Sequence, residues 1–160
     1  MFLILWDLPT TFVLELIMKR NVFVIVLLVG FVFSAFSQNI SDFGYQVRDR
    51  RITITGYRGS STTVIIPATI YGWSVVAIGD DAFNSKRLTS VTIPNSVTTI
   101  GSQAFFQNPL TSVIIPNSVT TIGGHAFAGD NRQLTSVVIP NSVINFDSTV
   151  FNNSVEIRRP

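Results

Sequence analysis

An 18-residue segment occurs three times in the chain, and this repetition restricts the fold more than any other feature of the sequence. LTSVTIPNSVTTIGSQAF (residues 88–105) returns as LTSVIIPNSVTTIGGHAF (residues 110–127) and, with more changes, as LTSVVIPNSVINFDSTVF (residues 134–151). The leucines that open the copies are 22 and 24 residues apart (110 − 88 and 134 − 110). A period of this length predicts a solenoid, in which each copy forms one coil and stacked coils bury each other's apolar side chains.

A first copy begins with STTVIIP (residues 61–67) and is longer than the others. The spacing from its proline to its isoleucine is 11 residues (78 − 67), against six in the later copies (100 − 94). The five extra residues predict an inserted loop with Tyr71, Gly72 and Trp73 at its tip. Tyr71 and Trp73 are therefore candidate loop contacts with a partner, and the alternative is that Trp73 folds back over the N-terminal end.

Each copy contains a V-x-I-P segment, such as VTIP at residues 91–94. Alternate side chains of a strand point to opposite sides, so the first and third residues are expected to face inward. Proline has no N–H to donate and is expected to end each strand. The chain then returns along a second wall, with a short helical turn around Ala-Phe, through Val97, Ile100, Ala104 and Phe105.

These features predict a mainly β solenoid with short helical turns over residues 60–160. It should contain about four coils of 22–27 residues, built from stacked parallel strands, behind an N-terminal β-hairpin cap at residues 38–59. Within the cap, RITIT (residues 51–55) alternates as a strand does and is flanked by turn residues. Without a cap the first coil would expose its core and an open strand edge.

Charged residues concentrate in this cap, and we interpret them as a solvated surface rather than a ligand-binding cluster; they are Arg48, Asp49, Arg50, Arg51 and Arg58. At the other end, Val155 and Ile157 occupy the V-x-I positions of a further strand. The charges and proline of Arg158-Arg159-Pro160 discourage edge-to-edge strand pairing. This end is either a simple cap or a sign that the gene is truncated.

The N-terminal residues have the pattern of an export signal. A basic pair, Lys19-Arg20, precedes an uncharged apolar run at residues 22–33 and small residues that permit a cut after Ser37. Residues 18–37 are therefore expected to be a signal peptide, and residues 1–17 an extension from an upstream start site. The apolar run is about twelve residues, whereas crossing a bilayer takes about twenty. The alternative is an uncleaved segment that retains the protein at a membrane.

The composition leaves little room for catalysis or for a cofactor. The chain has no Cys and one His, which excludes a disulfide framework and thiolate chemistry. His125 stands at a variable position of the repeat, and no Asp neighbours it in sequence to orient it as a base. Asp80-Asp81 falls short of the six to eight oxygen ligands that calcium takes. We expect no enzyme activity, metal or cofactor, and a net charge of +2 does not indicate a nucleic-acid partner.

The pattern L-x-x-V-x-I-P-x-x-V-x-x-I-G-x-x-A-F resembles the BspA-like class of leucine-rich repeats, and the resemblance covers residues 62–157. It implies a leucine-rich repeat solenoid like those of bacterial and protist surface and secreted proteins. It also implies a role as an adhesin or binding scaffold. The last copy departs from the pattern, with Phe146-Asp147 in place of Ile-Gly and Val150 in place of Ala.

The outward strand positions are the remaining candidates for function. They should form two rows on a flat, nearly uncharged sheet, where exposed apolar residues often mark a contact site. The alternative is that β-branched residues are there because they fit strands. The rows are Thr63, Ser90, Ser112 and Ser136, and Ile65, Thr92, Ile114 and Val138.

We therefore expect a secreted or cell-surface module that binds a protein or glycan through this face. One alternative is a structural spacer, or a fragment of a larger repeat array. Another is a hydroxyl array that orders water or binds a crystal surface, formed by Thr89, Thr111 and Thr135.

Overall fold

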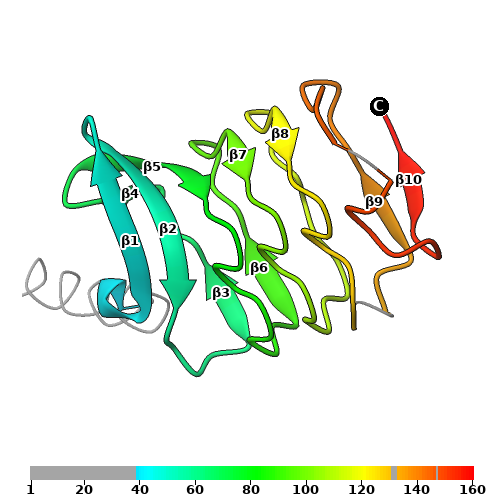
Figure 1. The fold of residues 1–160 in the computed structure, drawn as a ribbon, viewed down its shortest axis with the longest axis horizontal. Helices are drawn as coiled ribbons and strands as arrows, with labels where there is room; N and C mark the ends of the chain where they lie inside the picture. Colours follow the sequence, from blue (N-terminus) through cyan, green and yellow to red (C-terminus); the bar gives the residue numbers. More distant parts are fainter. Residues whose placement is uncertain (1–38, 131–132, 147) are drawn as a thin grey trace, which may run out of the picture. The chain divides into compact units, whose positions relative to one another are not determined.

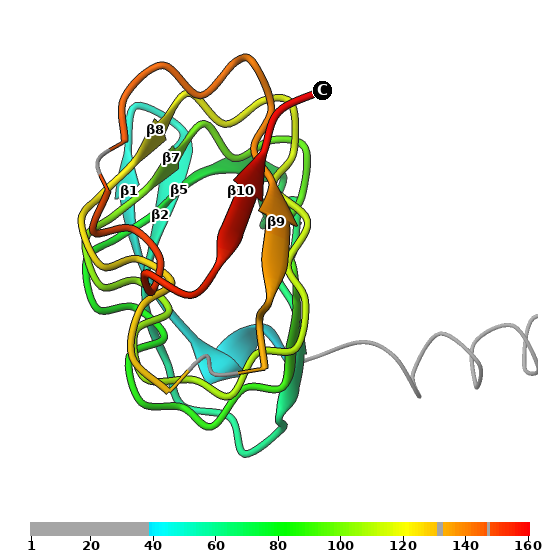
Figure 2. The same ribbon diagram turned by 90° about the vertical axis from the view of Figure 1, so that its right-hand side faces the viewer.

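Two ladders of short parallel strands run across the stacked coils, one on each side of the solenoid. The structure is a computed structural model that describes residues 39–130, 133–146 and 148–160. Wall A contains the V-x-I segments, in β3 (Thr63–Ile65), β6 (Ser90–Thr92), β9 (Ser136–Val138) and β10 (Glu156–Arg158). Wall B contains β2 (Arg51–Tyr57), β5 (Trp73–Ile78), β7 (Thr99–Ile100) and β8 (Thr121–Ile122). Figure 2 shows β9 and β10 on one side of the coils and β7 and β8 on the other.

The predicted solenoid class is confirmed, with about five turns. Wall B forms one continuous sheet, because β2 pairs in parallel with β5, β5 with β7 and β7 with β8. A parallel bridge between Thr121 and Asn145 continues this ladder into the next coil. Wall A forms two separate parallel pairs, β3 with β6 and β9 with β10.

An antiparallel hairpin closes the N-terminal end, as the sequence predicts (Figure 1). A 3-10 helix, η1 (Ile40–Asp42), leads into β1 (Phe43–Arg48), which pairs antiparallel with β2. The edge of β2 that β1 does not occupy pairs with β5, so the hairpin joins the wall B sheet as its first member. The inserted loop of the first coil is a second hairpin, in which β4 (Thr69–Ile70) pairs antiparallel with the start of β5.

The inward positions of the repeat form one continuous core, which confirms the predicted alternation. The first and third residues of the four V-x-I segments between residues 64 and 139 are buried, and so are the valine, isoleucine, alanine and phenylalanine of the return path. Ile157 of the last segment is 41% exposed. The opening leucines lie in the same core and are 0 to 1% exposed: Leu88, Leu110 and Leu134. Each coil therefore contributes side chains that only its neighbours can cover.

The closing phenylalanines stack in a column along the solenoid. Ring centroids are 5.0 Å apart between Phe83 and Phe105, 5.1 Å between Phe105 and Phe127, and 5.3 Å between Phe127 and Phe151. The interplanar angles are 13°, 11° and 9°, so the rings are nearly parallel. Tyr57 of the cap continues the column at 5.6 Å from Phe83. Because strands in a sheet are about 4.8 Å apart, the ring spacing matches the spacing of a β-ladder.

The prediction of a short helical turn around Ala-Phe is wrong. Within the described residues these segments are consecutive hydrogen-bonded turns, with Ala104 N donating to Gly101 O at 3.4 Å and Phe106 N to Gln103 O at 3.0 Å. The residue before the alanine has a positive φ in three coils: 55° at Asp81, 55° at Gln103 and 59° at His125. A left-handed residue in the middle of the segment ends a right-handed helix.

These turns bond between coils instead of along a helix. Gln103 N donates to Gly124 O at 2.9 Å, and Phe105 N donates to Ala126 O at 2.8 Å. The glycine of the I-G pair is required because neighbouring coils lie very close together at this corner. A Cβ at Gly101 would lie 2.6 Å from the backbone nitrogen of Asp80, closer than real Cβ contacts.

Asn108 is a buried polar residue that the repeat pattern does not predict. Its Oδ1 accepts hydrogen bonds from Lys86 N at 3.1 Å and Leu88 N at 2.9 Å. Its Nδ2 donates to Phe83 O at 2.8 Å and to Phe105 O at 2.9 Å. One side chain therefore satisfies backbone groups of two coils at the corner beside the phenylalanine column, as burial of polar groups requires.

The last strand is present but is displaced by two residues from the expected alignment. Ile157 lies opposite Val137, the first inward position of the V-x-I segment, and not opposite the third. A two-residue shift leaves each side chain on its original face, and Arg159 then stands where other coils have an inward isoleucine. The guanidinium of Arg159 donates to Pro140 O and Val143 O, at 3.3 and 3.2 Å. It also lies 5.4 Å from the ring centroid of Phe146, so Arg159 covers this end.

The expected extension (residues 1–17) and signal peptide (residues 18–37) lie outside the described residues. Within the described part of the chain, no helix has the length and apolar character needed to cross a membrane.

We predict that Phe105→Ala lowers the free energy of unfolding by about 3–5 kcal/mol, because it removes a ring stacked on both sides and leaves a cavity. Urea unfolding followed by circular dichroism measures this change. The matched control is Phe106→Ala, since Phe106 is only half-buried, and it should cost roughly 1 kcal/mol or less. Equal losses in the two variants would contradict the structural role of the column.

Candidate functional site

The outward residues of wall A lie in two rows, as the strand registers show. Thr63 is opposite Ser90 and Ile65 is opposite Thr92 in the β3–β6 pair. In the β9–β10 pair, Ser136 is opposite Glu156 and Val138 is opposite Arg158. The second row exposes its apolar members strongly, at 43% for Ile65, 81% for Ile114 and 54% for Val138.

The expected flat sheet is interrupted in the middle of wall A. Residues 112–115 are not in a strand, and within the described residues their backbone makes no hydrogen bond to a neighbouring coil. The connection to the preceding coil is at Thr111, whose N–H donates to Thr89 O at 3.4 Å. On wall B the same coil stays paired through β7 and β8. The coils are therefore held at hydrogen-bonding distance on wall B but not on this part of wall A.

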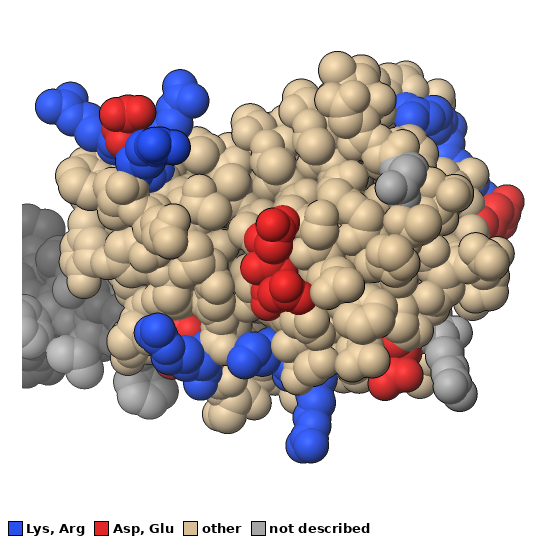
Figure 3. Space-filling model, in the orientation of Figure 1, with Lys and Arg blue, Asp and Glu red and all other residues tan. Residues whose placement is uncertain are grey.

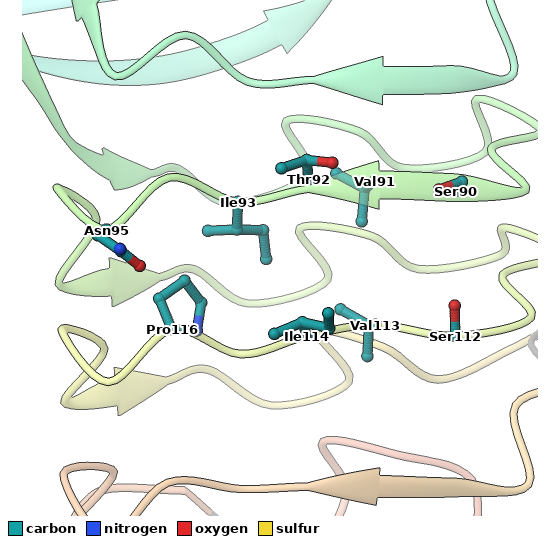
Figure 4. A pocket seen from close by; sticks show the side chains of 9 residues that line it. All are labelled: Ser90, Val91, Thr92, Ile93, Asn95, Ser112, Val113, Ile114 and Pro116. Atoms are coloured by element: carbon teal, nitrogen blue, oxygen red, sulfur yellow. The ribbon is translucent and has the colours of Figure 1, made fainter.

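Two hollows result, one on each side of residues 112–115. The first has a volume of about 250 Å³ and lies between β6 and the segment that carries Ser112 and Ile114. Figure 4 shows Asn95 and Pro116 at one end of it and Ser90 and Ser112 at the other.

The second hollow, between residues 112–115 and β9, has a volume of about 290 Å³ and reaches Pro160. Its lining also includes Asn117, Val138 and Pro140. We call Ile114 with its two flanking hollows the Ile114 ridge. The site predicted as a flat surface is thus a ridge between two depressions.

The C-terminal end of wall A is charged, whereas the two predicted rows consist of uncharged residues. Glu156 and Arg158 form an ion pair at 2.7 Å on the exposed surface of β10. The hydrogen bond from Arg158, and then its charge, lower the pKa of Glu156 below its ordinary value. The same contacts raise the pKa of Arg158. Both side chains are exposed, so the pair contributes local charge and little stability.

Tyr71 and Trp73 lie at the second hairpin, as the sequence predicts. Tyr71 and Gly72 form the two-residue turn between β4 and β5, with φ of 51° and 81°. The Tyr71 side chain is 78% exposed and that of Trp73 is 41% exposed. Trp73 is therefore partly covered and partly available, and Tyr71 is available.

The titratable residues that were candidates for catalysis or metal binding make contacts within the fold instead. Asp80 Oδ1 accepts from Ser102 N at 2.7 Å in the next coil, and Asp81 accepts from Asn84 Nδ2 at 2.7 Å. These carboxylates stabilise turns. His125 lies at the edge of the Phe106 ring, with centroids 6.4 Å apart. Within the described residues no group of three or more His, Cys, Asp or Glu could hold a metal ion.

Short parallel strands, one per coil, with buried leucines and a phenylalanine column define a leucine-rich repeat solenoid. The chain belongs to the BspA-type leucine-rich repeat family, whose model matches residues 57–159 in six copies. No curated protein matches the sequence.

Solved structures of bacterial leucine-rich repeat proteins have the same fold. A leucine-rich repeat protein from Bacteroides capillosus is 28% identical with a TM-score of 0.67, covering 76% of this chain and 97% of its own. A leucine rich cell surface protein from Faecalibacterium prausnitzii is 27% identical with a TM-score of 0.59, covering 77% and 42%. The T. pallidum leucine-rich repeat protein is 24% identical with a TM-score of 0.57, covering 71% and 65%, and supports the fold alone. The chain thus spans about two thirds of the T. pallidum structure and less than half of the F. prausnitzii structure.

We predict that Ile114→Ser changes the free energy of unfolding by no more than about 0.5 kcal/mol, because its side chain already faces solvent. Val113→Ser should cost about 2–3 kcal/mol, since Val113 is 9% exposed and its replacement buries a hydroxyl. Urea midpoints of the two variants measure the difference. A larger loss for Ile114→Ser than for Val113→Ser would show that residues 112–115 have the opposite orientation.

Proposed function

We propose that this protein is a secreted or cell-surface binding module that engages a protein or glycan through wall A. The observation that supports the proposal best is the Ile114 ridge, where an isoleucine 81% exposed stands between two hollows. Exposed apolar groups that are contiguous with concave surface are typical of contact sites.

The chemistry of the ridge suits a partner that inserts side chains or sugar groups. The hollows combine apolar walls from valine, isoleucine and proline with hydroxyls and amides from Ser90, Ser112, Asn95 and Asn117. The apolar walls favour burial, and the polar groups at the rims can fix orientation by hydrogen bonds. The buried positions beneath do not need to change for this surface to vary, so a repeat protein can acquire specificity at its outward residues alone.

Two observations favour a position outside the cell. The structurally similar F. prausnitzii protein is described as a leucine rich cell surface protein. The N-terminal sequence has the pattern of a signal peptide at residues 18–37, which leads us to infer export.

A structural spacer is the second candidate function. The match covers 42% of the F. prausnitzii protein, so similar coils are part of a longer chain there. This favours a role for the coils as parts of longer arrays. The hydroxyl-array alternative has less support, because Thr89 Oγ1 donates to Thr62 O at 3.3 Å within the solenoid. A regular external array would need such hydroxyls directed to water.

We predict that Ile114→Arg with Val138→Arg lowers partner binding at least tenfold. Large charged side chains would block both hollows and replace the apolar row. The measurement uses the protein expressed from the full sequence, labelled and applied to arrays of extracellular proteins and of glycans, followed by titration of each hit.

The matched control is Ile144→Arg, because Ile144 is 76% exposed and its N–H bonds to Thr120 O on the wall B side. It should retain binding. Equal binding by all three proteins would remove wall A as the site, and a lack of any hit would favour the spacer.

We also predict that the exported protein begins at Gln38. Expression of the full sequence in a secreting bacterial host, followed by N-terminal sequencing of the protein in the medium or on the cell surface, measures the cut site. A chain that begins at Met1 or Met18 and stays with the membrane fraction would support the uncleaved anchor instead.

A further inference from the structure

Two tight turns lie side by side at one end of the wall B sheet. The first is Asp49-Arg50 between β1 and β2, and the second is Tyr71-Gly72 between β4 and β5. Because β2 and β5 are parallel, with Arg51 opposite Ser74, the residues just before these strands meet at the same level. Figure 1 shows both hairpins at the N-terminal end of the solenoid.

The two turns carry different but compatible chemistry. The first is flanked by arginines and the second by aromatic residues, and all of these side chains are exposed. We call the set the cap rim; it consists of Arg48, Arg50, Arg51, Tyr71 and Trp73. Arginine, tyrosine and tryptophan are the residue types that most often dominate binding energy at interfaces.

The backbone at the cap rim is strained in a way that stability alone does not favour. Asp49 and Arg50 have φ of 51° and 58°, and Tyr71 has φ of 51°. Two-residue hairpin turns with positive φ at both central positions prefer Asn-Gly or Asp-Gly. An arginine at the glycine position costs stability. A role in binding a ligand would explain why large side chains occupy these strained positions.

The arginines, which the sequence alone led us to interpret as a solvated surface, are also available for a ligand. Within the described residues, neither Asp49 nor any other acidic residue forms a salt bridge with Arg48, Arg50 or Arg51. In Figure 3 positive side chains project around an acidic group at the end of the molecule where Figure 1 draws the β1–β2 turn. Most of the visible surface between this turn and the C-terminal end carries few charges. The rim therefore gathers several positive side chains in one place, apart from other exposed basic residues such as Lys86 and Arg87.

We propose that the cap rim binds a linear anionic polysaccharide. Guanidinium groups pair in a bidentate manner with carboxylate and sulfate oxygens, and the flat faces of Tyr71 and Trp73 supply rigid amphipathic area on which sugar rings can stack. Both turns are exposed at the same end of the sheet, so a flexible anionic chain can lie across them. This surface is separate from the Ile114 ridge of wall A.

The test measures binding of heparin, a linear sulfated polysaccharide, by the protein expressed from the full sequence at several salt concentrations. Arg48→Gln/Arg50→Gln/Arg51→Gln should lower affinity at least tenfold at 0.15 M salt. It should also reduce the slope of log K against log salt concentration by about two to three. Each ionic contact releases counterions when heparin binds, so the loss of three arginines means that fewer counterions are released. Tyr71→Ala/Trp73→Ala should lower affinity at least threefold with the slope unchanged.

The matched control removes the same charge from another place. Arg58→Gln/Lys86→Gln/Arg87→Gln replaces three exposed basic residues outside the rim and should change heparin affinity no more than twofold. An equal loss in both triple variants would overturn the proposal, since attraction would then depend on net charge alone. If Ile114→Arg/Val138→Arg still binds heparin, the cap rim binds independently of the wall A site.

Arg50→Gly separates a binding role from a structural one. It should raise the urea midpoint by relieving the positive φ, and it should lower heparin affinity at least twofold. A higher midpoint with unchanged affinity would overturn the role of Arg50. Failure to bind heparin, or binding to phosphatidylserine vesicles without binding to heparin, would overturn the polysaccharide proposal as a whole.

Discussion

The distance between coils is set by the stacked phenylalanine rings and the wall B ladder acting together. Ring centroids 5.0 to 5.3 Å apart and parallel strand pairs from β2 to β8 both require neighbouring coils to lie at the spacing of a β-sheet. The turn segments between them add bonds such as Phe105 N to Ala126 O. Burial, stacking and backbone pairing thus favour the same pitch. The other features of the fold adapt to it.

Wall A is less constrained because two sides of each coil are already fixed. Its V-x-I segments keep their inward side chains buried, yet hydrogen bonds between coils are absent at residues 112–115 within the described chain. The outward residues there are released from sheet geometry, which produces the Ile114 ridge and its two hollows. One wall therefore holds the coils together, and the other presents a surface that can vary.

The two ends of the solenoid are closed by different means. At the N-terminal end, β1 and β2 extend the wall B sheet, and Phe43 and Tyr57 continue the aromatic column. At the C-terminal end, Arg159 replaces an inward isoleucine and bonds to two backbone carbonyls over Phe146. Charged residues lie at both ends, whereas the outward residues of wall A from β3 to β9 are uncharged, so the ends and this part of wall A offer chemically distinct surfaces.

The sequence by itself determined the period, the inward residues, the cap hairpin and the place of the inserted loop, because burial and strand alternation depend on local spacing. It did not determine the left-handed turns at Asp81, Gln103 and His125, the register of β10, or the inward place of Arg159. Those depend on contacts between coils, and no single repeat contains them. The Ile114 ridge and the cap rim were decided by the tertiary structure alone. Residues 90–92 form a paired strand and the equivalent residues 112–114 do not, although the two repeats are nearly identical in sequence. Arg51 lies opposite Ser74 because β2 and β5 pair in parallel.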